Sequence, residues 1–139
     1  MRPALNAGFT LLEMVVVLVL LGVATALTMP AVIKMHEASV NSNIRNQINA
    51  AFNALPVYVL QSGQEVYLTK YPENPYPLPQ EFSDVLSEEN VTLALEHPLQ
   101  ISPLGFCVEE TKIWVSHGSW RYRLVLRSPD CRVVNQNEL

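Results

Sequence analysis

Glu13 is the ionisable residue in this sequence with the clearest chemical consequence, because a long apolar run follows it directly. Met14 to Ile33 is a run of 20 residues without a charge. A carboxylate at the edge of such a run is costly to place near lipid, so it needs a cationic partner or must extend to the headgroups. Glu13 is therefore a candidate for an ion pair, and a carboxylate that extends to the headgroups is the alternative.

The other residues that could do chemistry do not form a recognisable catalytic or metal-binding set. The three histidines are far apart in the sequence: His36, His97 and His117. Ser116-His117 is better explained as part of a turn than of a catalytic triad. Three acids could bind a cation, although a solvated acidic helix face is the simpler interpretation: Asp84, Glu88 and Glu89. There is no glycine-rich phosphate loop either, so we expect no enzyme activity, no metal and no cofactor.

Length and composition limit the class of protein. The chain has 139 residues, enough for one domain plus an anchor. Hydrophobic residues make up 49% and charged residues 16%, which excludes a disordered chain. The formal net charge of −4 argues against a generally basic nucleic-acid binder. Residues 1–33 hold only two charges, Arg2 and Glu13, so the sequence predicts an apolar N-terminal segment joined to a polar domain.

The uncharged run is long enough to cross a membrane. Twenty residues at about 1.5 Å each give a helix of about 30 Å, the thickness of the hydrocarbon core. Arg2 and the amino terminus favour a cytoplasmic N-terminus, although Lys34 on the far side opposes this. A signal peptide cleaved at the small residues 24–26 is the alternative. Glu13 and the continuation of the run to Ile33 argue against cleavage there.

The residues around Glu13 resemble a known motif. Gly8-Phe9-Thr10-Leu11-Leu12-Glu13, after a short leader and before the apolar run, is similar to the N-terminus of type IV prepilins and type II secretion pseudopilins. The resemblance implies that a membrane prepilin peptidase cleaves after Gly8 and methylates the new amine on Phe9. It places Gly22 and Pro30 at common family positions in the helix, where a kink is expected. The expected parts are a leader at 1–8, a transmembrane and assembly helix at 9–33, and a periplasmic head at 34–139.

The resemblance also implies an assembly role for Glu13. Its carboxylate would neutralise the Phe9 amine of a neighbouring subunit and so set the axial offset between the two. The implied partners are other pilin or pseudopilin subunits, prepilin peptidase, an inner-membrane assembly platform and membrane lipid. The implied location is the bacterial inner membrane, with a single span and the C-terminal head in the periplasm, followed by assembly into a filament.

The kind of filament stays open at this point. Some major pseudopilins have an aspartate-rich calcium loop near the C-terminus, whereas this C-terminus has only Asp130 and Glu138. We therefore expect a minor pseudopilin of a type II secretion system. One alternative is a minor type IV pilin involved in pilus assembly, adhesion or DNA uptake. The other is a soluble periplasmic binding domain released from a signal peptide.

Apolar residues at helical spacing continue beyond the membrane segment. They predict an amphipathic helix with one buried stripe: Val40, Ile44, Ile48, Phe52 and Leu55. We expect one helix from about Phe9 to about Leu55, with a kink or local melting at Pro30. Pro56 is expected to have the same effect at the far end, and Val57–Ser62 could add a further turn before Gly63 ends the helix.

The remaining residues predict a loop, a short helix and several strands. Residues 71–79 hold four prolines and predict an extended surface loop, and a short helix is expected around Phe82–Leu86. Runs of strand-forming residues, with a hairpin turn at 116–119, predict strands: Val91–Leu95, Gly105–Glu109, Lys112–Ser116, Trp120–Arg127 and Cys131–Val134. The expected fold class is α+β, a long N-terminal membrane-spanning helix packed on a small antiparallel sheet, as in pilins.

Two cysteines bracket the last three predicted strands. If the head lies outside the cytoplasm, a disulfide between Cys107 and Cys131 is allowed. Two free buried thiols are the alternative. The resemblance favours the bridge, since many type IV pilins close a C-terminal loop in this way.

Charge is segregated within the predicted head. Residues 81–110 hold seven acids and no base, while residues 112–132 hold five bases and one acid. Such patches could guide contacts between heads in a filament. Trp120–Arg127 alternates, with Trp120 and Tyr122 on one face of the strand. The other face is a candidate interaction face with three arginines: Arg121, Arg123 and Arg127. This face could instead bind a nucleic-acid backbone, but a solvated strand is the simplest interpretation and nucleic acid is not an expected partner.

Overall fold

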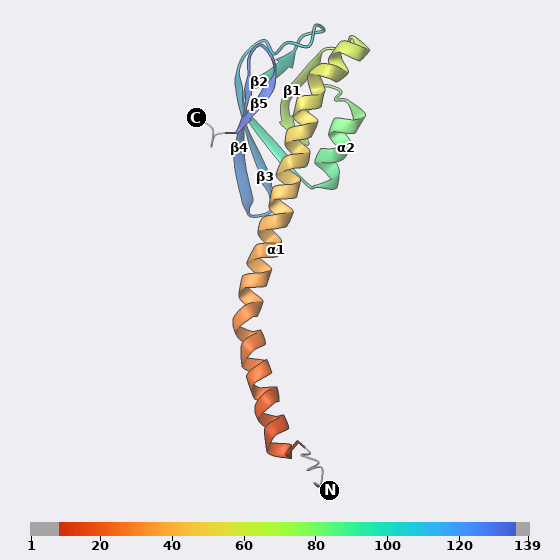
Figure 1. Cartoon of the computed structure of the whole chain (residues 1–139). Helices are drawn as coiled ribbons and strands as arrows, with labels where there is room; N and C mark the ends of the chain where they lie inside the picture. The colour runs from red at the N-terminus through yellow and green to blue at the C-terminus, as the bar shows by residue number, and fades with distance from the viewer. Residues whose placement is uncertain (1–8, 136–139) are drawn as a thin grey trace. The chain divides into compact units, whose positions relative to one another are not determined.

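A computed structural model describes residues 9–135, which form two helices and five strands (Figure 1). The elements, in order, are α1 (Leu11–Ser62), β1 (Val66–Tyr71), α2 (Gln80–Glu88), β2 (Thr92–Ile101), β3 (Thr111–His117), β4 (Trp120–Arg127) and β5 (Arg132–Asn135). The chain divides into two compact units, Met1–Val40 and Asn41–Leu139, and α1 contributes to both. The predicted α+β class, a long N-terminal apolar helix and an antiparallel sheet, is confirmed.

The part of α1 in the first unit is an unbroken helix with exposed apolar side chains. It continues through Pro30, so the predicted local melting at this residue is wrong. The hydroxyl of Thr25 donates to the carbonyls of Leu21 and Gly22, at 3.0 and 2.9 Å, and Thr28 makes the same kind of bond one turn on. These bonds give both threonine hydroxyls partners on the helix itself, which lets them lie in an apolar environment. A bend at Gly22 and Pro30 stays a prediction.

Helix α1 continues past Leu55 to Ser62, so the further turn predicted over Val57–Ser62 is confirmed. Pro56 does not stop the helix, because the next turn carries Val59, which is fully buried in the core. The core contact outweighs the one hydrogen bond that proline removes. Gly63 then ends the helix with a φ of +68°, and its N–H donates to the carbonyl of Val59 at 2.8 Å.

The sheet is an antiparallel meander in the order β1-β2-β3-β4-β5. Strands β3, β4 and β5 and helix α2 lie where the sequence predicted them. Strand β1 was missed, although Val66 and Leu68 alternate with less buried residues as in a half-buried strand. The predicted strand at Gly105–Glu109 is wrong: this segment is a loop with one isolated bridge between Ile101 and Cys107.

Strand β2 is longer than predicted and contains a bulge. Leu68 pairs with Leu99, whereas Lys70, two residues on, pairs with Ala94. Between these pairs β1 has one residue and β2 has four, residues 95–98, so Pro98 lies in the bulge and has no pairing partner on β1. The carbonyl of His97 in this bulge accepts a hydrogen bond of 2.7 Å from the buried hydroxyl of Thr111.

The core of the second unit forms where α1 and α2 cover one face of the sheet. The predicted stripe on α1 is confirmed for Ile44, Ile48, Phe52 and Leu55, each at most 4% exposed. The ring of Phe52 meets the edge of the Phe82 ring from α2, with centroids 5.0 Å apart. Val40 lies outside this core and is 42% exposed. The head therefore buries one face of its sheet and leaves the other face to solvent.

Candidate assembly site

The start of α1 is shaped by Thr10, which the sequence analysis had not singled out. Its side-chain oxygen accepts a hydrogen bond of 3.2 Å from the backbone N–H of Glu13, and its carbonyl accepts one from Met14. Thr10-Leu11-Leu12-Glu13 has the spacing of a capping box, and this pattern could have identified the helix start. Thr10 thus fixes the backbone at Glu13 as the third residue of the helix.

Phe9 and Glu13 lie about one helical turn apart at this N-terminus. The described chain begins at Phe9, so Gly8 and the predicted scissile bond lie outside the described residues. The N-terminus of a helix carries a partial positive charge, which favours the carboxylate of Glu13 and disfavours an extra cation. An amine created on Phe9 would lie at this positive end, and a carboxylate partner would compensate for it. The local geometry thus suits an amine–carboxylate pair.

The helix that follows presents apolar side chains on every side. From Leu11 to Ile33 the large hydrophobic residues are between 43% and 84% exposed. This stretch is long and apolar enough to cross a membrane. A helix that is apolar all round needs lipid or other helices around it. Within the described residues, nothing covers the apolar side chains of this part of α1, so they need lipid or other helices around them.

Comparison with family models adds the deciding observation. Residues 4–29 match the model described as the prokaryotic N-terminal methylation motif. The chain carries the prepilin signature of type IV pilins and pseudopilins. The matched range includes Gly8, Phe9, Glu13 and Gly22, and it ends one residue before Pro30. No curated protein and no solved structure matched the chain.

The prepilin signature supports a structural, pilin-like or pseudopilin subunit that a prepilin peptidase processes and that assembles with other pilin subunits. A single-pass inner-membrane anchor suits both the signature and the long apolar helix. Among residues 9–135, no group of three or more His, Cys, Asp or Glu side chains is placed to hold a metal ion. The Nδ1 atom of His117 lies 2.6 Å from the carbonyl of Glu89, the residue that follows α2.

A disulfide between Cys107 and Cys131 holds the C-terminal loop of the head. The two Cα atoms are 5.1 Å apart, and both residues are buried. The N–H of Cys107 donates to the carbonyl of Pro129 at 3.0 Å, and the hydroxyl of Ser128 donates to the carbonyl of Cys107 at 3.0 Å. The loop after β2 is thus joined to the β4–β5 turn by both the disulfide and hydrogen bonds.

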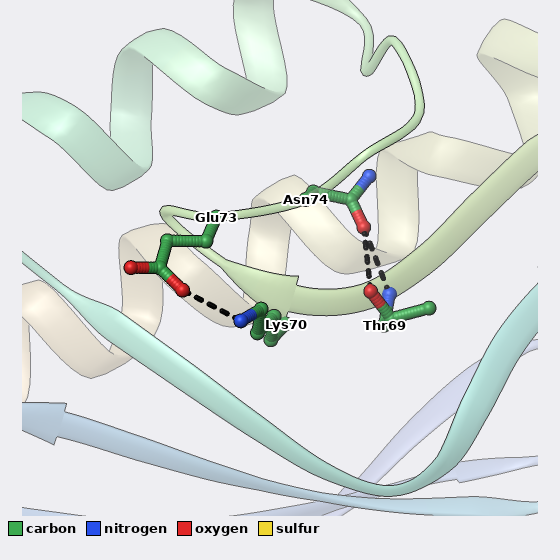
Figure 2. A network of polar contacts seen from close by, with 4 residues as sticks. All are labelled: Thr69, Lys70, Glu73 and Asn74. Atoms are coloured by element: carbon green, nitrogen blue, oxygen red, sulfur yellow. Dashed lines mark hydrogen bonds and ion pairs between the residues drawn. The ribbon is translucent and has the colours of Figure 1, made fainter.

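Asn74 closes one edge of the sheet. Its side-chain oxygen accepts a hydrogen bond of 2.9 Å from the N–H of Thr69 (Figure 2). Its side-chain amide donates to the carbonyl of Tyr67 at 3.0 Å, and both bonds lie on the free edge of β1. A 2.6 Å ion pair between Lys70 and Glu73 holds the same loop. The proline-rich segment predicted as a surface loop therefore covers a sheet edge.

Asn53 acts at the opposite edge of the sheet. Its side-chain oxygen, on α1, accepts a hydrogen bond of 3.1 Å from the backbone N–H of Val133 in β5. Unpaired edge strands are templates for pairing with another chain, and side chains that occupy edge groups suppress it. With Asn74 at β1 and Asn53 at β5, assembly of heads by strand addition is disfavoured at both edges.

The predicted arginine face lies on the exposed side of the sheet. Arg121 and Arg127 are exposed, and the guanidinium of Arg123 lies 5.2 Å from the ring centroid of Trp114. Trp114 is 42% exposed and pairs with Arg123 across β3 and β4. Arg121 also donates from Nε to the hydroxyl of Ser116 at 3.2 Å.

The predicted alternation along β4 is confirmed: Trp120 and Tyr122 lie on the opposite side of the sheet from these arginines. Alternate residues of a strand face opposite sides, so both aromatic rings turn toward α1 and pack against the core. Arg45 of α1 lies 5.7 Å from the centroid of the Tyr122 ring. Burial of the Tyr122 hydroxyl raises its pKa, although the charge of Arg45 acts in the opposite direction. The aromatic member of the arginine face is therefore Trp114.

Proposed function

We propose that this chain is a minor pseudopilin of a type II secretion system, a structural subunit of a pilus-like filament built from the inner membrane into the periplasm. One observation supports the pilin-like part of this proposal: residues 4–29 have the prepilin signature, and the large apolar side chains of α1 from Leu11 to Ile33 are not covered by the described residues. Such a helix is stable first in lipid and then among the helices of a filament core.

Assembly follows from the chemistry at the helix start. Cleavage between Gly8 and Phe9 removes the leader and creates a methylated amine on Phe9. As a subunit leaves the bilayer, its Glu13 carboxylate pairs with the Phe9 amine of a subunit already in the filament. Either charge alone is costly in an apolar environment, and the cost is offset when the two charges pair. The carboxylate and the amine meet at only one axial offset between the two subunits, so pairing selects that offset.

The N-terminus of the mature protein tests the proposal directly. Mass spectrometry of the full chain, purified from cells that carry a prepilin peptidase, should find a start at N-methylated Phe9. A strain without the peptidase should yield the unprocessed chain. A start at Leu27 would instead show release by signal peptidase and a soluble periplasmic domain, and it would exclude a pilin-like subunit.

A minor type IV pilin that takes up DNA is a second candidate, and the exposed Trp114–Arg123 pair favours it. Arginine and an exposed aromatic ring are the groups that bind single-stranded nucleic acid. This candidate predicts salt-sensitive DNA binding by the processed full chain. Replacing Arg121, Arg123 and Arg127 together by alanine should abolish the binding, and unchanged binding would exclude this face as the DNA site.

A further inference from the structure

The second unit has an apolar groove between its two helices. The groove has a volume of about 310 Å³ and lies between Ala50, Ala51 and Ala54 of α1 and Phe82 and Val85 of α2. Figure 1 shows α2 beside this part of α1. Three of the five α1 residues that line the groove are alanines, beside Gln47 and Leu55, so most of this wall carries short side chains. The groove can therefore receive a flat apolar side chain from another molecule.

Acidic residues line the exposed side of α2 next to this groove. Glu81 contributes to the groove wall, and Asp84 and Glu88 follow one and two turns later, all three exposed. The ion pairs found among the described residues, Lys70–Glu73 and Lys112–Glu96, involve none of them. A partner for this groove would therefore be apolar at its centre and basic around it.

The opposite face of the same head has this chemistry. Trp114 is an exposed aromatic side chain on the outer face of the sheet, and Arg121 and Arg123 lie on the neighbouring strand. Asp84 and Glu88 are about 6 Å apart along a helix axis. Arg121 and Arg123 are about 7 Å apart along a strand. The two sets of charges can thus meet in one contact.

We propose that Trp114 of one copy of this chain inserts into the α1–α2 groove of a second copy, with Arg121 and Arg123 facing Asp84 and Glu88. The contact joins two different surfaces of the head, so it is heterologous. The first copy keeps its own groove open, and the second copy keeps its own Trp114 face open, so each can bind a further copy. Asn74 bonds two backbone groups at the β1 edge and Asn53 bonds one at the β5 edge, which favours the faces over the edges for contacts between heads. The inference rests on the proposed function. A minor subunit is compatible with two adjacent copies in one filament.

Photo-crosslinking of the processed full chain in membranes tests the contact. Trp114 is replaced by p-benzoylphenylalanine, and the dimer formed on illumination is digested and analysed by mass spectrometry. We expect crosslinks to residues 47–54 or 79–85 of the second copy. The same probe at Tyr76, which is 49% exposed in the proline-rich loop, is the matched control and should give no dimer through these residues.

Charge reversal supplies an independent test. Asp84→Lys with Glu88→Lys should lower the Trp114 crosslink about tenfold or more, because like charges then face each other. Adding Arg121→Glu and Arg123→Glu to the same chain should restore it. Glu109→Lys with Glu110→Lys makes the same change in net charge outside the contact and should leave the crosslink unchanged.

Three outcomes would overturn this inference: no dimer, a dimer crosslinked at other residues, or failure of the second reversal to restore the crosslink. The proposed function is judged separately in the same samples. A mature start at N-methylated Phe9 together with absent crosslinks rejects the Trp114 contact alone. A start at Leu27 rejects the pilin-like function itself.

Discussion

The two parts of α1 differ in what surrounds them, although they belong to one continuous helix. In the first unit the large hydrophobic residues from Leu11 to Ile33 are at least 43% exposed. In the second unit, Ile48, Phe52 and Val59 are fully buried against α2 and the sheet. The first part depends on lipid or on neighbouring subunits, whereas the second carries its own core. Changes in the first part should therefore alter assembly, and changes in the second should alter the stability of the head.

The largest expected effect is the loss of filament assembly in Glu13→Gln. The amide keeps the size of the side chain but removes the charge that would pair with the Phe9 amine, so the axial offset is no longer selected. Filaments sheared from cells should contain none of this variant, while its processing to Phe9 continues. Glu37→Gln makes the same chemical change at another exposed position of α1 and should assemble normally. Equal assembly of the two variants would contradict the pairing.

Phe52→Ala should destabilise the head by about 3–5 kcal/mol, since it leaves a cavity beside Phe82. Denaturant unfolding of the full chain in detergent, followed by tryptophan fluorescence, measures the change. Leu18→Ala, at a position 68% exposed in the first unit, should leave the same transition within about 0.5 kcal/mol. A similar loss in both variants would show that the two parts of α1 are not energetically distinct.

Opening the disulfide should cost about 3 kcal/mol, because the bridge closes a loop with a sequence separation of 24 residues. The measurement is the unfolding free energy of the full chain with and without a reductant. Cys107→Ser with Cys131→Ser should match the reduced wild-type chain and should not respond to the reductant. If the oxidised and reduced wild-type chains unfolded alike, the bridge would have no part in the stability of the head.

Asn74→Ala should have the smallest effect on stability, about 1–2 kcal/mol, through the lost hydrogen bonds to Tyr67 and Thr69. It should also expose the edge of β1 and so promote association of heads, which light scattering of the detergent-solubilised chain detects. Asn46→Ala, an exposed position on α1, serves as the control. Unchanged stability and light scattering in Asn74→Ala would show that the Asn74 hydrogen bonds neither stabilise the head nor prevent association through the edge of β1.

Much of the fold follows from local patterns. The apolar run and the stripe around Phe52 predict α1, because helical spacing places these residues on one side of a helix. Strand β4 and its hairpin with β3 follow from alternation and from Gly118, which has a φ of +56° in the turn. The signature around Glu13 was also visible, since it is a contiguous motif. The head disulfide was favoured by resemblance, and the structure contains it.

Other features depend on contacts between distant segments. The helix passes Pro56 because Val59 reaches the core, and Gly105–Glu109 is a loop because the bridge to Cys131 and the turn at Pro129 hold it. Asn53 reaches Val133 across 80 residues of sequence. Such bonds form between side chains and backbone groups that only the folded head brings together, so no local pattern predicts them.

The sequence by itself determined the processing motif, the apolar helix with its lone carboxylate at Glu13, and the α+β class. These are properties of contiguous segments, in which residue type and spacing are sufficient. Tertiary structure alone decided which surfaces the head leaves open: edges occupied by Asn53 and Asn74, an outer face with Trp114 and a groove between α1 and α2. A surface is defined by what packs beneath it, and that depends on segments far apart in the chain.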